Sequence, residues 1–250
     1  MDRMTDTNKS IAAYDDLARV SSYDADMDIM HPNRHRMAEV IVEVLAAGER
    51  TLSSVLDLGT GTGFLLRRLL RRFPDVRAVA LDGARAMLDL ARARLGKDAE
   101  RVDFRVGDFR DLADLCRGAG PFDAVVSSFA LHHLPPEEKS RLAQTASAML
   151  GPDGWFLDAD VIRAESDYLE ELTQRMRVRG IVERAAGRDQ RFLDQASTHA
   201  FLQAMEEKEG DQPQRLASDL AALTSAGLDP VTVFWRETRE VVIGGIRTRG

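Results

Sequence analysis

The chain has 250 residues, 44% of them hydrophobic and 30% charged, with a formal net charge of −7. This length suffices for one sizeable domain with a full core, and the acidic balance disfavours nucleic acid as a partner. The single cysteine, Cys116, excludes an internal disulfide and a cysteine-based metal site, so we expect no metal.

The first fifty residues predict a helical cap. A short helix is expected from Ile11 to Val20, and a loop from Ser21 to Pro32, where acidic residues precede a His-Pro break. A second helix begins at Pro32, with apolar residues three and four apart, and ends at Gly48. We assign residues 1–50 to this cap.

A glycine-rich turn follows the first expected strand, which begins at Ser54 and includes Asp57. The turn Gly59-Thr60-Gly61-Thr62-Gly63 leads into an apolar-faced helix, so its backbone can pass close under a ligand and free N–H groups point at it. The turn lacks the lysine of a P-loop and the last glycine of the dinucleotide pattern. Asp57 would repel a pyrophosphate but suits a cation such as an ammonium group.

The second expected strand, Val76 to Leu81, ends at Asp82-Gly83 before a helix from Ala84 to Leu95 that turns Met87 inward. Asp82 lies about 20 residues after the glycine turn, where α/β nucleotide sites place a ribose-binding carboxylate. Capping of the following helix is the other reading of Asp82, and the two roles are compatible.

Two further strands end in residues that suit a ligand site. Val102 to Val106 is followed by Gly107-Asp108-Phe109, and Phe122 to Ser128 is followed by Phe129 and the run Leu131-His132-His133-Leu134. In an open parallel sheet, ligands bind beyond the carboxyl ends of the strands. His132 or His133 would there take a proton from a nucleophile or serve as a structural hydrogen bonder.

The remaining chain completes an α/β pattern. The expected elements are a helix over 137–150, a fifth strand over 155–160, charged helical sequence over 166–209, a last helix over 214–226, and a hairpin of strands over 231–236 and 240–245. We divide the chain after the cap into a core (51–160), a helical insertion (161–212) and a C-terminal helix and hairpin (213–250).

Together these motifs resemble those of the class I S-adenosylmethionine (SAM)-dependent methyltransferases. The resemblance rests on the acidic residue and G-x-G-x-G turn, on Asp82 before a helix opening with a small residue and "ML", and on "FDxVxSxxxLHHL". The segment "AGLDPVTVFWR…VVIGG" is similar to the end of a bacterial subgroup related to carboxy-SAM synthases. The family implies a Rossmann-like sandwich with strand order 3-2-1-4-5-7-6 and an antiparallel C-terminal hairpin.

The resemblance also implies roles for individual residues. Asp57 and the glycine turn would contact the methionine part of SAM, Asp82 the ribose, and Asp108 with Phe109 the adenine. The full set of expected cofactor residues is Asp57, Gly59, Thr60, Gly61, Gly63, Asp82, Gly83, Met87, Gly107, Asp108, Phe109, Ser127, Ser128 and Phe129. His132 and His133 are the catalytic candidates, and Tyr14, Tyr23, His31 and Arg36 are candidates for a substrate lid.

The implied reaction is methyl transfer from SAM to an oxygen or nitrogen atom of a small-molecule acceptor, leaving S-adenosylhomocysteine. One alternative is a SAM-modifying enzyme of the carboxy-SAM synthase type, with Arg179 or Arg191 binding the added carboxylate. A second is a SAM-binding module without turnover, and the glycine spacing counts against a nicotinamide dehydrogenase.

A further alternative is a nucleic-acid acceptor, as in a tRNA methyltransferase, and one arginine cluster supports it. The other interpretation of this cluster is a solvated helix face. The cluster consists of Arg175, Arg177, Arg179, Arg184 and Arg188. The sequence has neither a membrane-length apolar run nor a signal pattern at its start. We therefore expect a cytoplasmic protein with no membrane partner, either a monomer or a homodimer.

Overall fold

The computed structural model describes residues 6–15, 17–48 and 51–248. Within these residues, seven strands form one sheet in the order β3-β2-β1-β4-β5-β7-β6. Neighbouring strands are parallel except at β7, which runs antiparallel to both β5 and β6. The strands are β1 (Ser54–Leu58), β2 (Arg77–Asp82), β3 (Val102–Val106), β4 (Phe122–Ser128), β5 (Leu150–Val161), β6 (Val231–Glu237) and β7 (Glu240–Arg247). The fold class and strand order expected from the sequence are confirmed.

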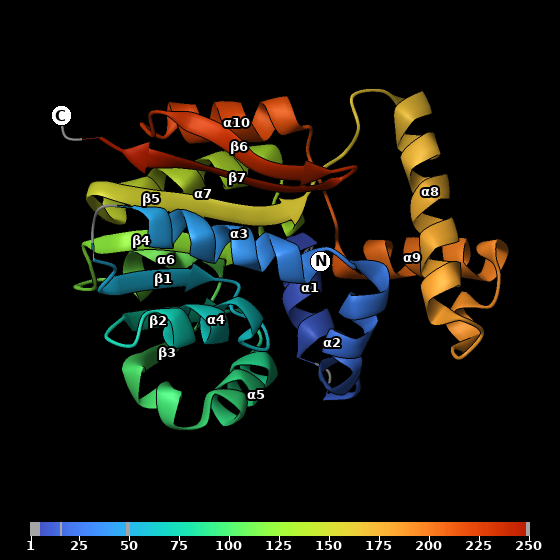
Figure 1. Ribbon diagram of the computed structural model, residues 1–250, viewed down its shortest axis with the longest axis horizontal. Helices are drawn as coiled ribbons and strands as arrows, with labels where there is room; N and C mark the ends of the chain where they lie inside the picture. The colour runs from blue at the N-terminus through green and yellow to red at the C-terminus, as the bar shows by residue number, and fades with distance from the viewer. Residues whose placement is uncertain (1–5, 16, 49–50, 249–250) are drawn as a thin grey trace, which may run out of the picture.

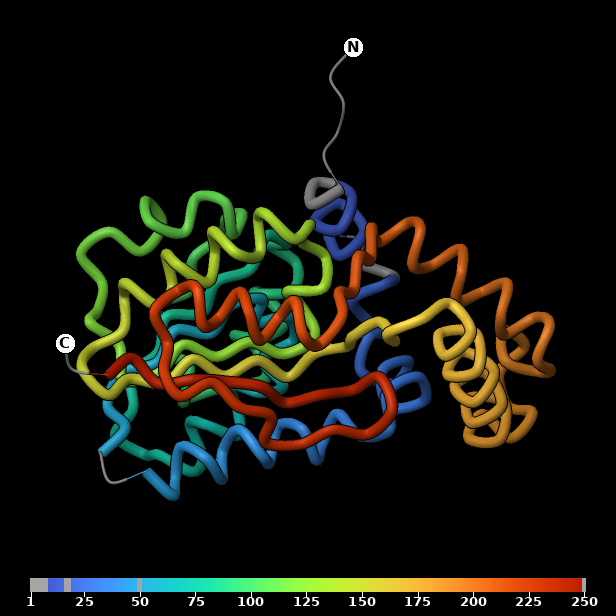
Figure 2. Tube along the Cα trace, turned by 90° about the horizontal axis from the view of Figure 1, so that it is seen from above, coloured from blue at the N-terminus to red at the C-terminus, as the bar shows by residue number. Residues whose placement is uncertain are grey.

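Helices cover both faces of the sheet (Figure 2). They are α1 (Asp6–Tyr14), α2 (Leu17–Met30), α3 (Arg34–Ala47), α4 (Phe64–Arg72), α5 (Arg85–Leu95), α6 (Leu112–Leu115), α7 (Pro136–Met149), α8 (Asp167–Ala185), α9 (Gln195–Glu209) and α10 (Leu216–Ser225). Short 3₁₀ turns lie at Gly96–Arg101, Phe109–Asp111, Leu131–His133 and Gln190–Phe192.

Burial on both faces explains why the central strands are apolar throughout. In β1, Val55 packs into one hydrophobic cluster and Leu56 into the other, and neither is exposed to solvent. Successive residues of a strand point to opposite faces, so a sheet covered on both sides needs continuous apolar runs. One cluster lies under α3 and α4, and the other lies under α7 and α10.

The carboxyl ends of the parallel strands point toward the side where α1, α2, α8 and α9 gather (Figure 1). There α1 packs against α9, and α2 packs against α8 and α5. By contrast, α3 packs on the sheet against β5, β6 and β7. The N-terminal helices and the segment after β5 therefore meet over the strand ends where ligands are expected.

Three expected elements were wrong. Helix α1 ends at Tyr14 and α2 begins at Leu17, whereas we had expected one helix from Ile11 to Val20. Residues 17–30 form the helix α2, whereas we had expected a loop over Ser21 to Pro32. The acidic residues looked like turn signals, but Asp24 and Asp26 are both held by arginine partners. In addition, β5 begins at Leu150 rather than Trp155, and a register irregularity in its pairing with β4 accommodates the extra residues.

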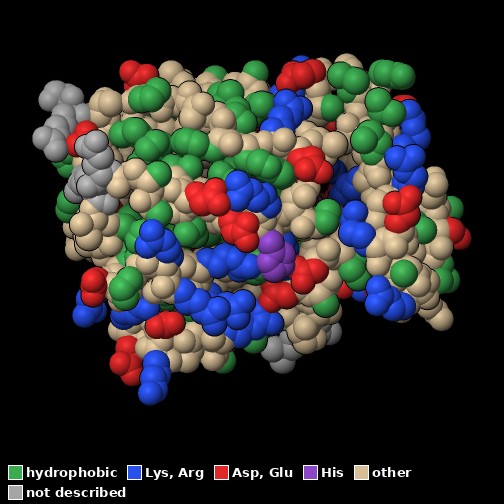
Figure 3. Space-filling model, in the orientation of Figure 1, with side chains coloured by type: hydrophobic (Ala, Val, Ile, Leu, Met, Phe, Trp, Pro, Cys, Tyr) green, Lys and Arg blue, Asp and Glu red, His purple; other side chains and the backbone are tan. Residues whose placement is uncertain are grey.

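The surface carries both signs of charge. Lys and Arg side chains lie among Asp and Glu across the face drawn in Figure 3. None of the described helices combines the length and the apolar character that a membrane crossing requires.

Candidate active site

Three adjoining pockets lie at the carboxyl ends of the strands. We call them the strand-end pocket, which includes Asp82 and Phe109, the loop pocket, which includes Asp57, and the charged pocket, which includes Arg239. Tyr23 and Phe129 line all three. These two aromatic side chains are therefore the shared wall of the site.

The glycine turn is shaped by close backbone approach. Gly59 has φ of +70°, and a Cβ built on it would lie only 2.3 Å from Cβ of Ala130. The N–H groups of Gly59 and Thr60 both donate to the carbonyl oxygen of Leu81 at the end of β2. A glycine is needed here both for the left-handed backbone and for the contact with the segment after β4.

Asp82 joins the turn to the next strand end. Its Oδ2 accepts from the N–H of Gly61 at 2.7 Å, and its Oδ1 accepts from the N–H of Ala84 at 2.8 Å. Burial raises the pKa of this carboxyl, although the two N–H donors oppose the shift. Each carboxylate oxygen can accept a further hydrogen bond, and Asp82 lines the strand-end pocket, as a ribose site requires.

Asp57 is a buried carboxylate with an unmet oxygen. It is 2% exposed, and its Oδ2 has no hydrogen-bond partner among the described residues. Burial raises its pKa to about 7, and the negative charge of Asp82 adds to this shift. A buried acid beside a pocket is stabilised in its charged form by a cation. The residues present thus fit the ammonium group of a methionine moiety.

Most expected cofactor residues line one of the first two pockets. The strand-end pocket is bordered by Gly59, Gly61, Asp82, Gly83, Met87, Gly107, Asp108, Phe109 and Phe129. The loop pocket is bordered by Asp57, Gly59, Thr60, Gly61, Ser128 and Phe129. The carboxylate of Asp108 already accepts hydrogen bonds from the backbone N–H and the guanidinium of Arg110. An adenine amine would therefore share this carboxylate with Arg110.

Two expected cofactor residues, Gly63 and Ser127, have structural contacts of their own, and their role toward the cofactor stays a prediction. A Cβ on Gly63 would meet Ala91 at 3.2 Å, so this glycine lets α4 approach α5. The hydroxyl of Ser127 is buried and donates to the carbonyl oxygen of Leu58 at 2.9 Å, which ties β4 to β1. Neither residue lines the three pockets.

Phe129 is strained at the centre of the site. Its φ is +53°, in the left-handed region that a bulky residue rarely adopts. Its N–H donates to the carbonyl oxygen of Ala159, and its ring centroid lies 4.7 Å from that of His31. Such strain persists only where the surroundings enforce it, and it is often found at functional sites.

Three of the four lid candidates line the pockets. Tyr14 and Tyr23 border both the strand-end and the charged pockets, and His31 borders the charged pocket. Arg36, however, is exposed and pairs with Glu43 on the outer side of α3, so the structure does not bring it to the site.

His132 is held by a carboxylate. Its Nδ1 lies 2.5 Å from Oδ1 of Asp160, whose Oδ2 accepts from the backbone N–H of His132. Burial lowers the pKa of the imidazole, but the charges of Asp160 and Asp211 outweigh this and raise it to about 9. At neutral pH His132 is therefore protonated. Its ring acts as a hydrogen-bond donor and would have to lose a proton before it could act as a base.

His133 points into the strand-end pocket, while His132 lines the charged pocket. Asp211 bridges them, since its Oδ1 lies 3.0 Å from Nδ1 of His133 and 3.7 Å from Nε2 of His132. These three residues offer ligand atoms within 4.8 Å of one another, close enough to hold a metal ion. We interpret them as an ion-paired network, and the expectation of no metal stays a prediction.

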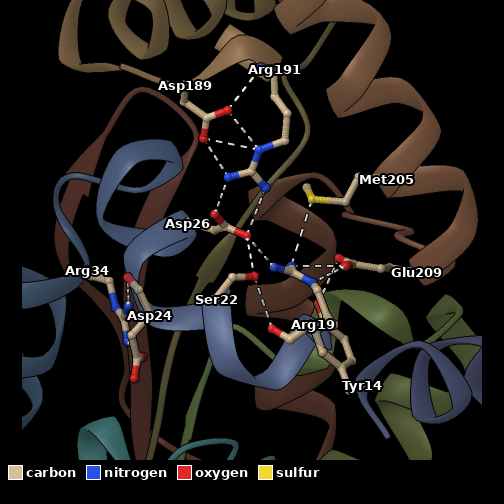
Figure 4. Close-up of polar contacts among 10 residues, drawn as sticks. All are labelled: Tyr14, Arg19, Ser22, Asp24, Asp26, Arg34, Asp189, Arg191, Met205 and Glu209. Carbon is tan, nitrogen blue, oxygen red and sulfur yellow. Dashed lines mark hydrogen bonds and ion pairs between the residues drawn. The ribbon is translucent and has the colours of Figure 1, made fainter. Parts of the chain in front are cut away.

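Sequence reasoning missed the residues that bind α2 to the glycine turn. Oγ1 of Thr62 donates to the carboxylate of Asp24, which also accepts from Arg34 at 2.7 Å (Figure 4 shows the latter pair). Arg94 pairs with the same carboxylate. The apolar spacing of Val20, Tyr23, Met27 and Met30 in the sequence was the available signal for this helix.

Comparisons with known proteins agree with this geometry. Residues 55–154 match the family model described as "Methyltransferase domain". The match spans the glycine turn and the carboxyl ends of β1, β2, β3 and β4. An uncharacterized methyltransferase of Bacillus licheniformis is 33% identical over 138 residues, which cover 54% of this chain and 60% of that protein. The biotin biosynthesis bifunctional protein BioHC of Teredinibacter turnerae is 31% identical over 144 residues, which cover 54% and 24%.

Solved structures extend the likeness beyond the methyltransferase domain. An O-methyltransferase family protein from Burkholderia thailandensis matches 95% of this chain and 62% of its own, with a TM-score of 0.67 and 21% identity. The DhpI-SAM-HEP complex matches 98% and 99%, with a TM-score of 0.62 and 20% identity. At these identities the likeness establishes the fold, and the match to the methyltransferase model agrees with the family resemblance expected from the motifs.

Proposed function

We propose that this protein transfers a methyl group from SAM to an oxygen or nitrogen atom of a small-molecule acceptor and releases S-adenosylhomocysteine. The observation that carries the proposal is the buried carboxylate of Asp57 beside the glycine turn, whose Oδ2 has no hydrogen-bond partner among the described residues. The carboxylate of Asp82 lies at the end of the next strand and accepts from the same turn. The matched methyltransferase domain contains both residues.

The chain would bind SAM across the strand-end and loop pockets. Asp57 would pair with the ammonium group, Asp82 would accept from the ribose hydroxyls, and Phe109 would pack on the adenine. When bound, SAM supplies a methyl group that its sulfonium already makes electrophilic. The protein then has to hold the acceptor in line and keep water out, effects worth about 7–11 kcal/mol in well-oriented reactions.

The acceptor would occupy the charged pocket, which meets the cofactor pockets at Tyr23 and Phe129. Protonated His132 would donate a hydrogen bond to the acceptor there. His133 lines the strand-end pocket on the cofactor side of the same network, so it would take up a proton only from an acceptor that reaches past Tyr23 and Phe129 into that pocket.

The structure gives the alternatives little support. Arg179 pairs with Glu183 on an exposed face, and Arg191 pairs with Asp26 and Asp189, so neither lines the pockets as a carboxy-SAM site would need. The arginine cluster on α8 is not one solvated face, because the Arg177 side chain is only 8% exposed. This weakens the argument for nucleic acid as acceptor.

Calorimetric titration with SAM, S-adenosylhomocysteine and NADH tests the proposal, after mass spectrometry of the purified protein for a bound nucleoside. We expect micromolar binding of the first two and none of NADH. Asp82→Ala should weaken SAM binding at least ~10-fold through lost charge-assisted hydrogen bonds, whereas the exposed control Asp114→Ala should not. Absence of SAM binding would overturn the proposal, and an unchanged Asp82→Ala would overturn the ribose placement.

A further inference from the structure

The turn between β6 and β7 sends an arginine inward. Arg239 follows Thr238, whose φ is +51°, and its side chain is only 9% exposed. Its carbonyl oxygen accepts from the N–H of Ile162 at 2.7 Å, which fixes the turn over the end of β5. The guanidinium therefore lines the charged pocket rather than extending into solvent from the hairpin.

This guanidinium has unmet donors. Nε and Nη1 of Arg239 are buried and have no hydrogen-bond partner among the described residues. Oε1 of Glu206 is 3.8 Å from Nη1, an ion pair too long for a hydrogen bond. An arginine is rarely buried without a partner, and each unmet charged donor costs more than a neutral one.

A second arginine increases the excess of donors. Arg177, 8% exposed, donates through Nη1 to the same Oε1 of Glu206, while its Nε is buried without a partner. Two guanidinium groups thus share one carboxylate. Burial lowers the pKa of Arg239 to about 10, and the charge of Arg177 contributes, yet Arg239 stays protonated at neutral pH.

The other carboxylates that line this pocket are engaged elsewhere. Glu209 accepts from the hydroxyl of Tyr14 and from Arg19, which lies between Glu209 and Asp26 in Figure 4. Asp211 faces the two histidines. These acids reduce the local positive potential, but none of them supplies the hydrogen bonds that Arg239 lacks.

We propose that Arg239 and Arg177 bind an oxyanion group of the acceptor, a carboxylate or a phosphate or phosphonate. This inference rests on the proposed function and names the substrate class. Planar guanidinium donors match the oxygens of such groups, and the resulting hydrogen bonds are charge-assisted. A neutral acceptor would leave the buried donors unpaired, so the pocket selects against it.

Isothermal titration of the protein saturated with S-adenosylhomocysteine provides the test. The anionic probes are acetate, benzoate and phenylphosphonate, and the neutral counterparts are acetamide, benzamide and benzyl alcohol. We expect at least one anion to bind 10-fold or more tightly than its neutral counterpart. Comparison of benzoate with phenylphosphonate distinguishes the carboxylate from the phosphonate form of the group.

Substitution of the two arginines tests whether they bind the anion. Arg239→Gln should remove the preference for the anion, and Arg177→Gln should reduce it, without changing the affinity for S-adenosylhomocysteine. The matched control is Arg179→Gln, because this arginine of α8 is 65% exposed and pairs only loosely with Glu183 at 4.0 Å. Circular dichroism and thermal melting check that each variant is folded.

Failure of the proposed function and failure of the anion subsite would give different results. If the protein does not bind S-adenosylhomocysteine, the proposed function fails. If it binds that product but takes anions no better than their neutral counterparts, or if folded Arg239→Gln retains the preference, the anion subsite is overturned. The comparison on the unmodified protein decides the question even if Arg239→Gln does not fold.

Discussion

The two sides of the site are built in different ways. The cofactor side comes from successive strand ends and their turns, and its contacts are largely made by backbone groups and short carboxylates such as Asp82. The charged pocket is assembled from distant segments. Tyr14 reaches Glu209 across 195 residues, and Arg19 reaches the same carboxylate across 190. Local geometry specifies the first side, whereas the complete tertiary fold is needed for the second.

The largest effect on ligand affinity is expected on the cofactor side. Gly59→Ala should weaken SAM binding by about 100-fold, because overpacking costs ~1–3 kcal/mol and is added to strain in a backbone with φ of +70°. Gly187→Ala is the matched control, since its φ is +69° and nothing lies within 4 Å of the added Cβ. Calorimetric titration with SAM measures both variants. Equal affinity of Gly59→Ala and Gly187→Ala for SAM would show that the glycine turn does not need a glycine at residue 59.

On the acceptor side, the free energy of unfolding should depend on the charge of His132. Its pKa in the folded state, about 9, lies above the ordinary 6.5, so the stabilisation is complete below pH 6.5 and is lost as the pH rises through 9. Asp160 and Asp211 face the ring and raise its pKa, while Lys139 opposes them.

Urea unfolding at pH 6, 7.5 and 9 measures this contribution. At ~1.4 kcal/mol per pH unit, the wild type should lose ~3 kcal/mol relative to His132→Gln between pH 6 and 9. A constant difference between the two proteins at all three pH values would show that the carboxylates do not hold the imidazolium.

A smaller effect is expected from Asp57. Because its pKa is raised to about 7 and an ammonium group would favour the ionised form, SAM should bind about 10-fold more weakly at pH 6 than at pH 8. Titrations in buffers of different ionisation enthalpy should also detect a released proton. Asp57→Asn should bind weakly and without this pH dependence, and a dependence that persisted in it would assign the proton to another group.

The sequence was sufficient where short-range patterns decide the structure. The strand order followed from the family resemblance of the motifs, and the placement of Asp57, Asp82 and Phe109 at strand ends followed from apolar runs ending in glycine and carboxylate. It was insufficient where a residue's role depends on partners far along the chain. Asp24 looked like part of a turn until Thr62 and Arg34 were found to hold it.

The charged pocket shows the same limit. Arg239 sits in a hairpin turn, where an arginine is ordinarily exposed, and its burial depends on the end of β5 and on the helices of the insertion. Gly63 and Ser127 were assigned to the cofactor by their motif, and the structure adds contacts that the motif did not predict: close packing for Gly63 and a strand-to-strand hydrogen bond for Ser127.

The shared wall of Tyr23 and Phe129 has a thermodynamic consequence. Any ligand that shifts either ring in one pocket alters the walls of the other two. The binding free energies of cofactor and acceptor are then coupled, and linkage requires the coupling to be reciprocal. Whatever factor the cofactor product imposes on acceptor affinity, the acceptor imposes on the retention of that product.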